Sequence, residues 1–99
     1  MITRIVRLTF RPEAIPAFLE IWRESRAHIR ARPGCLEARL FADEQDPNVY
    51  FTLSRWAAAA DLEAYRRSEL FGQVWPRTKA LFADKPHAYS LVAVPDGAA

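Results

Sequence analysis

The most restrictive feature of this sequence is the order in which two hydrophobic periodicities follow one another. Residues 2–10, 35–43, 48–56 and 85–94 have the period of two that is typical of β-strands, whereas 11–31 and the stretch from about Asp61 have helical spacing. The order is strand, helix, strand, strand, helix, strand. Two helices on one face of a four-stranded antiparallel sheet satisfy it, so we predict an α+β, ferredoxin-like βαββαβ fold.

Turn-forming residues separate these segments. The sequence RPG at 32–34 ends the first helical stretch, because proline and glycine terminate helices, and EQDPN at 44–48 is typical of a turn between two strands. Pro76 lies inside the second helical stretch and removes one backbone hydrogen bond, so we expect a kink or break near residues 72–76. Ser68 is expected to cap the second half of that broken helix.

Neither face of the predicted sheet has the polar pattern of a solvent-exposed face, although two helices cover only one of them. By alternation, one face carries Val6, Leu8, Phe10, Leu36, Leu40, Val49, Phe51 and Leu53, and the other carries Ile5, Phe41, Tyr50, Trp56 and Tyr89 mixed with Arg7, Arg39, Thr52 and Ser54. A second copy of the same sheet is the simplest cover for the uncovered apolar face. We therefore predict a twofold homodimer through the sheet face.

Length and composition exclude several classes of protein. The 99 residues suit one domain over 1–99, with a core at 2–94 and a C-terminal tail at 95–99. A net charge of +2, with arginines spread along the chain, argues against a nucleic-acid partner. No apolar run approaches the roughly 20 residues of a membrane span, so no membrane partner is expected. The N-terminus alternates, unlike a signal peptide, and the single Cys35 fits a reducing compartment, so we predict a cytoplasmic protein.

Candidate polar site residues lie on the mixed face and on the second helical stretch. If the mixed face lines a cavity, Arg7 or Arg39 could hold a phenolate or enolate oxygen, and the alternative is pairing with a carboxylate such as Glu37. Tyr65 and Tyr50 could orient a substrate through their hydroxyls, or could instead bond to backbone carbonyls.

Aromatic residues are the other candidates, because three tryptophans occur in this short chain. Trp22, Trp56 and Trp75 could form flat walls for a ring or could simply fill the core. The two histidines and one cysteine are too few for a full metal ligand set, and the three glycines are isolated, so no nucleotide-binding pattern exists. We therefore expect no metal and no cofactor.

The order of elements, RPG after the first helix and, above all, SRW (54–56) followed by DLEAYRRSELF (61–71) carry a family resemblance. With these features the sequence resembles the antibiotic biosynthesis monooxygenase domain, part of the dimeric α+β barrel superfamily, which includes quinol monooxygenases and haem-degrading enzymes. The resemblance covers nearly the whole chain, 2–94, and its most specific part runs from Trp56 to Phe71.

The functional residues of haem-degrading members are replaced here. Those members use an asparagine on the first strand, a tryptophan three residues before the motif serine and a histidine four residues after the motif phenylalanine. The matching positions are Arg7, Tyr65 and Trp75, so the axial histidine is missing and haem degradation is not expected. In quinol-oxidising relatives a histidine commonly stands at the position of Tyr65, and a phenol with a pKa of about 10 is a poor base at neutral pH.

The resemblance implies a cofactor-independent monooxygenase that oxidises an aromatic, quinol-like or polyketide-like small molecule with dioxygen. The substrate would supply the electrons as its anion in a dry cavity, with Arg7 and Tyr65 as catalytic residues. The substrate-binding residues would be Trp22, Arg39, Tyr50, Trp56, Phe71 and Trp75. The alternative is a non-catalytic dimer that binds a small molecule, and a third reading is that the aromatic residues only pack the core.

Overall fold

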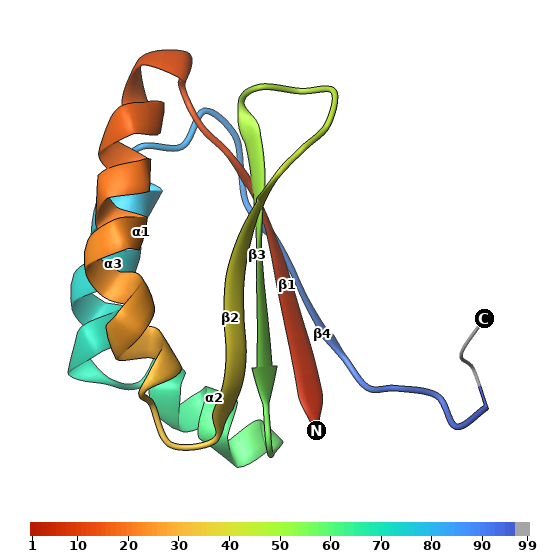
Figure 1. Cartoon of the computed structure of the whole chain (residues 1–99). Helices are drawn as coiled ribbons and strands as arrows, with labels where there is room; N and C mark the ends of the chain where they lie inside the picture. Colours follow the sequence, from red (N-terminus) through yellow and green to blue (C-terminus); the bar gives the residue numbers. More distant parts are fainter. Residues whose placement is uncertain (97–99) are drawn as a thin grey trace.

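The chain folds into one antiparallel sheet with its long helices on one side (Figure 1). The computed structural model describes residues 1–96, so the predicted tail at 95–99 lies mostly outside the described residues. The elements are β1 (Ile2–Thr9), the 3-10 turn η1 (Pro12–Ala14), α1 (Ile15–Arg30), β2 (Cys35–Ala42), β3 (Val49–Trp56), α2 (Ala59–Arg66), α3 (Glu69–Lys79) and β4 (His87–Leu91). The strand order is β2-β3-β1-β4, which confirms the predicted α+β ferredoxin-like fold. Within residues 1–96, no helix has the length and apolar character needed to cross a membrane.

The first helical segment and the turn after it follow directly from the sequence. Pro12 opens η1, where its missing N–H costs no hydrogen bond, and α1 buries Phe18 and Ile29 toward the sheet. Gly34 has a φ of +79°, and a Cβ at this position would overlap the Asp61 side chain. The glycine of RPG therefore lets the chain turn closely against α2 before β2 begins.

The break in the second helical stretch lies earlier than predicted. We expected it near 72–76, but α2 ends at Arg66 and α3 begins at Glu69, and α3 continues through Pro76. Ser68 causes the break at this point: its Oγ accepts a hydrogen bond of 3.2 Å from the Phe71 N–H, as predicted for a cap. Gly72, whose carbonyl loses its partner to Pro76, is exposed, so water can satisfy that carbonyl.

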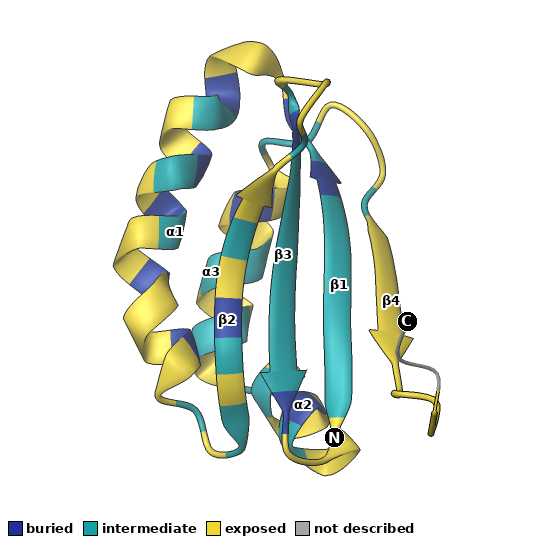
Figure 2. Cartoon of the chain, turned by 45° about the vertical axis from the view of Figure 1, so that its right-hand side comes forward, coloured by how far each residue is buried: buried dark blue, intermediate teal, exposed yellow. Residues whose placement is uncertain are grey.

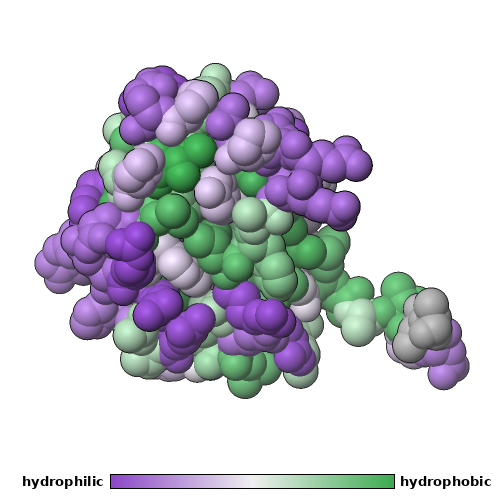
Figure 3. Space-filling view, turned by 45° about the horizontal axis from the view of Figure 1, so that its top comes forward, coloured by the Kyte–Doolittle hydropathy of each residue, from purple (hydrophilic) through white to green (hydrophobic). Residues whose placement is uncertain are grey.

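The last strand is shorter than the predicted 85–94. Leu91 lies opposite Thr3, near the start of β1, so the chain beyond it has no strand left to pair with. Figure 2 shows β4 exposed along its length, at the edge of the sheet. Apolar side chains continue from the body of the protein onto the segment after β4 (Figure 3), where Val92 is 68% and Val94 73% exposed.

The predicted faces of the third strand are exchanged in the structure. Val6 of β1 lies opposite Thr52, and directly opposite residues of antiparallel strands share a face. The β3 side chains on the helix-covered face are therefore Tyr50, Thr52, Ser54 and Trp56. The uncovered face, called the open face below, carries Ile5, Phe41, Phe51, Leu53 and Tyr89.

The core lies between the helices and the covered face of the sheet. Phe10 and Phe18 are buried and stack with ring centroids 4.1 Å apart. Leu8 completes this buried cluster, while Trp56 is fully buried at the other end of the sheet. Between these two ends the packing is incomplete, and the space left there is the candidate site.

Candidate functional site

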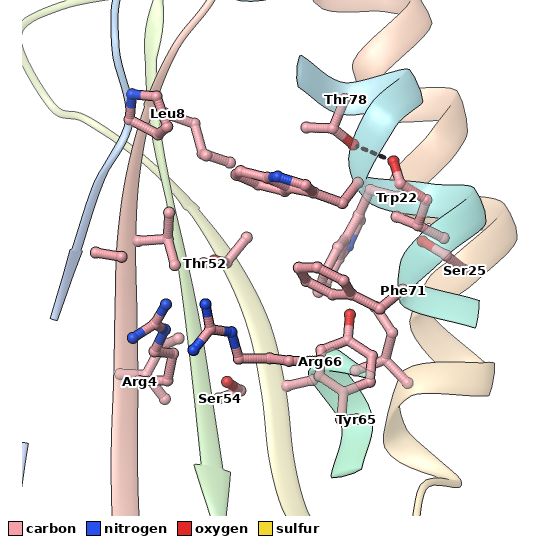
Figure 4. Close-up of a pocket in the computed structure, with 18 of the residues that line it drawn as sticks. Arg4, Leu8, Trp22, Ser25, Thr52, Ser54, Tyr65, Arg66, Phe71 and Thr78 are labelled. Atoms are coloured by element: carbon pink, nitrogen blue, oxygen red, sulfur yellow. Dashed lines mark hydrogen bonds between the residues drawn. The ribbon is translucent and has the colours of Figure 1, made fainter. Parts of the chain in front are cut away.

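A cavity of about 250 Å³ lies between the sheet and the three helices (Figure 4). Its sheet side is formed by side chains of β1 and β3 that face the helices, among them Arg4, Val6, Leu8, Thr52 and Ser54. Its helix side carries aromatic rings from all three helices, namely Phe18, Trp22, Tyr65, Phe71 and Trp75. The lining is mostly apolar, and its polar groups are the hydroxyls of serine, threonine and tyrosine side chains and the guanidinium groups of Arg4 and Arg66.

Three aromatic rings of the cavity wall, Tyr65, Phe71 and Trp75, form a continuous series of contacts. Tyr65 meets Phe71 edge to face at 5.3 Å between ring centroids, and Phe71 stacks on Trp75 at 5.8 Å with an interplanar angle of 13°. Behind the wall, Tyr65 stacks on Trp56 at 5.2 Å. At the other end Trp75 meets Phe82 at 5.7 Å, and Phe82 meets Phe10 at 5.4 Å. We call these six rings, from Trp56 to Phe10, the aromatic chain.

Four of the predicted site residues line the cavity, and two aromatic candidates do not. Trp22, Tyr65, Phe71 and Trp75 are lining residues. Trp56 is instead buried behind Tyr65, where its Nε1–H donates a 3.0 Å hydrogen bond to Ser54 Oγ. Tyr50 packs against Phe10 and Phe18, at centroid distances of 6.0 and 5.7 Å. Trp56 and Tyr50 therefore belong to the core and not to the cavity wall.

The predicted arginines lie on the wrong side of the sheet for a role in this cavity. Arg7 is paired with Phe51 on the open face, because strand side chains alternate and Val6 points toward the helices. Arg39 is also on the open face, where it pairs with Glu37 at 3.4 Å and lies over the Phe41 ring at 4.8 Å. Pairing with Glu37 was the alternative considered from the sequence, and the structure supports it.

Arg4 and Arg66 are the guanidinium groups that do line the cavity. Neither was predicted, although the sequence contained a signal for one of them. Arg4 interrupts the apolar side of the first strand, which otherwise carries Ile2, Val6 and Leu8. A charge on the core-facing side of a strand is rarely buried without a purpose. Arg66 gave no such signal, because it lies in a helix that is mostly solvent-exposed.

The hydroxyls of the cavity are oriented by the helices and strands that carry them. Ser25 Oγ donates to the Ile21 carbonyl at 2.7 Å, and Thr78 Oγ1 donates to the Val74 carbonyl at 2.9 Å. Both therefore present only acceptor lone pairs to the cavity. No His, Asp, Glu, Lys or Cys is among the described residues that line it. Across residues 1–96, no three His, Cys, Asp or Glu side chains gather to hold a metal ion.

Tyr65 contributes a phenolic hydroxyl to the mostly apolar wall. Burial raises the pKa of its hydroxyl to about 12, with nearby Cys35 adding to the shift and Arg32 opposing it. The hydroxyl therefore stays protonated at neutral pH. It can donate to a ligand oxygen, and it cannot serve as a general base there.

We expect a tyrosine ionisation near pH 12 that is absent from Tyr65→Phe, when phenolate absorbance is followed against pH. The folded pKa lies above the unfolded value of 10.0, so the unfolded chain releases this proton first. The free energy of unfolding should then be unaffected below about pH 10 and fall by roughly 2–3 kcal/mol toward pH 12. A step near pH 12 that persists in the phenylalanine variant would contradict this assignment.

Comparisons with known proteins relate these features to one family. The family model of the antibiotic biosynthesis monooxygenases matches residues 1–75, which include the aromatic residues that line the cavity. The crystal structure of an antibiotic biosynthesis monooxygenase is 29% identical, with a TM-score of 0.90, over 96% of this chain and 100% of that chain. PA3566 from Pseudomonas aeruginosa is 26% identical, with a TM-score of 0.82, over 94% of this chain and 93% of that chain.

A third solved structure shares the fold at lower identity. Rv0793 from Mycobacterium tuberculosis is 18% identical, with a TM-score of 0.87, over 98% of each chain. No curated protein matches the sequence.

Proposed function

This chain belongs to the antibiotic biosynthesis monooxygenase family, and from that membership we propose that it is a cofactor-independent monooxygenase. Its substrate is an aromatic small molecule, quinol-like or polyketide-like, which it oxidises with dioxygen. The observation that carries the proposal is a cavity with aromatic walls and without His, Asp, Glu, Lys or Cys among the lining residues that the structure describes. Such a site suits a substrate that brings its own acidity and its own electrons.

The proposed chemistry balances without an added reductant. In an anthrone-like substrate, an activated ring CH2 group and O2 become a C=O group and water. In a quinol, the ring gains one oxygen atom and loses two hydrogen atoms to give a hydroxyquinone and water. In both cases the substrate supplies every electron. The reacting form is the substrate anion, which is electron-rich enough to reduce dioxygen. The protein favours this anion by placing hydrogen-bond donors near its oxygen and by excluding water from a low-dielectric site.

The wall residues have distinct roles in this proposal. Phe71 and Trp75, whose rings are nearly parallel, form a flat surface on which an aromatic substrate packs. Tyr65 donates its hydroxyl proton in a hydrogen bond to a substrate oxygen. An apolar cavity of roughly 150 Å³ can hold benzene, so about 250 Å³ has room for more than one ring.

The cavity does not fit haem. Trp75 occupies the position of the axial histidine in haem-degrading members and packs its ring against Phe71 and Phe82. No histidine or cysteine lines the cavity among the described residues. No step through haem is therefore part of the proposal.

Oxygen consumption by the purified protein tests the proposed function. With a panel of quinols, anthrones and related phenols, we expect saturable uptake above the autoxidation seen with heat-denatured protein. Tyr65→Phe should lower kcat/KM at least about tenfold, because hydrogen bonds to charged groups are worth about 1.5–3 kcal/mol. Tyr89→Phe, at a tyrosine on the open face, is the matched control and should leave the rate unchanged.

One result would count against oxidation of such substrates, and a second measurement would then identify the alternative. Uptake no greater than with denatured protein would remove the proposed activity for this panel. If the same compounds then quench tryptophan fluorescence saturably, the protein is the non-catalytic binding module considered from the sequence.

The protein is also proposed to act as a homodimer through its open face. Phe41 is 39% and Tyr89 54% exposed on that face, with Phe51 and Leu53 half-buried between them. A contiguous apolar surface of this kind, left bare by the helices, is typical of an interface. Arg7, Arg39 and Arg55 surround it and would lie at the interface, away from the cavity.

A further inference from the structure

Two guanidinium groups from different elements meet at one end of the cavity. Arg4 extends from β1 and Arg66 from α2, and Figure 4 shows their guanidinium groups next to one another at the level between Thr52 and Ser54. Arg66 is exposed, with 46% of its side-chain surface accessible, so this end of the cavity opens to solvent. The aromatic wall occupies the opposite side.

The positive charge at this end is not balanced by the protein. Arg4 Nη1 donates a 2.9 Å hydrogen bond to Ser90 Oγ, and no carboxylate of residues 1–96 forms an ion pair with Arg4. Glu63 lies 3.7 Å from Arg66 but also 3.2 Å from Arg67, so its single charge is shared. Three arginines therefore face one carboxylate.

The two like charges raise each other's energy. Burial lowers the pKa of Arg4, and the charge of Arg66 lowers it further, while Glu63 acts in the opposite direction. A bound anion would relieve this repulsion. Planar guanidinium groups bind carboxylates through paired hydrogen bonds, a geometry that a water molecule cannot replace.

We propose that Arg4 and Arg66 together bind the carboxylate of an aromatic acid whose ring system occupies the cavity and packs against Phe71 and Trp75. This inference rests on the proposed function only in taking that acid as the substrate class. The carboxylate sits at the solvent end, and the rings reach the apolar end. Ser90 holds the Arg4 side chain in place, so β4 contributes to the site through a single hydrogen bond.

Binding of two matched probes tests the proposal without any turnover. Isothermal titration calorimetry should detect 2-naphthoate binding and at least about tenfold weaker binding of its neutral amide, 2-naphthamide. Arg4→Gln should weaken 2-naphthoate binding about tenfold and leave 2-naphthamide binding unchanged. Arg66→Gln, at an exposed position where a folding defect is not expected, should weaken it about threefold.

Arg23→Gln is the control for net charge. Arg23 is exposed on α1 and pairs with Glu20 at 2.6 Å, outside the cavity lining, so its loss should not change either affinity. Equal affinities for the acid and the amide would overturn the proposal, and so would equal effects of Arg23→Gln and Arg4→Gln. No saturable heat with 2-naphthoate would overturn it as well.

The outcome is separable from that of the oxygen-uptake experiment. Selective naphthoate binding that depends on Arg4, in a protein without oxygen uptake, would support the anion site and reject the monooxygenase. Oxygen uptake by a protein that binds 2-naphthoate and 2-naphthamide equally would support the monooxygenase and reject the anion site.

Discussion

Trp56→Ala is expected to lower the free energy of unfolding by about 3–5 kcal/mol, the usual cost of truncating a buried tryptophan. Trp56 is fully buried at the end of β3 and stacks on Tyr65 with an interplanar angle of 22°. Its removal would leave a void that the neighbouring rings cannot fill without moving. Urea denaturation at one fixed protein concentration measures the loss, since a dimer's stability depends on concentration.

Trp75→Ala is the matched comparison, because Trp75 belongs to the same aromatic chain but lines the cavity. One side of its ring already faces open space, so truncation forfeits fewer contacts and should cost clearly less stability than Trp56→Ala. Binding of an aromatic ligand should weaken at the same time. Equal stability losses with no effect on binding would mean that the aromatic residues only pack the core.

Phe51→Glu is expected to convert the proposed dimer to a monomer. Phe51 lies in the middle of the open face, opposite Arg7 on one side and Phe41 on the other. Twofold symmetry would bury two carboxylates for each substitution, and burying a charge without a full set of partners costs several kcal/mol. The dissociation constant should therefore rise by at least about a hundredfold.

Sedimentation velocity over a range of concentrations measures this shift. Ala17→Glu adds the same charge at an exposed position of α1 and should leave the dimer intact. Circular dichroism should show that Phe51→Glu retains the fold, since the open face contributes little to the core of one subunit. A wild-type protein that sediments as a monomer, or a variant that remains a dimer, would contradict the proposed interface.

The order and type of the elements could be predicted from the sequence, because alternation and helical spacing are local signals. The sequence did not predict which face of the sheet each set of alternating side chains in a strand occupies. In VYFTLSRW (49–56), the more apolar phase, with Phe51 and Leu53, lies on the open face. The alternate side chains, which include Thr52 and Ser54, face the helices, where their hydroxyls line the cavity.

That exchange of faces also explains the errors among the predicted site residues. Arg7 and Arg39 are predicted near the site because alternation alone assigns them to the same face of the sheet as Thr52 and Ser54. The register of β1 with β3 puts Arg4 beside Ser54 instead. Register depends on contacts between strands that are distant in sequence, so no local pattern could supply it.

The aromatic chain has a consequence for how this fold acquires new substrates. Because the cavity wall and the deepest core residues are links of one series of contacting rings, a substitution that reshapes the wall also loosens the core behind it. Residues in direct contact have non-additive effects, often by 0.5–3 kcal/mol. Substrate preference should therefore change through paired substitutions of aromatic residues, in which the second substitution restores packing. Single substitutions in the wall should be less frequent because they lower the stability of the fold.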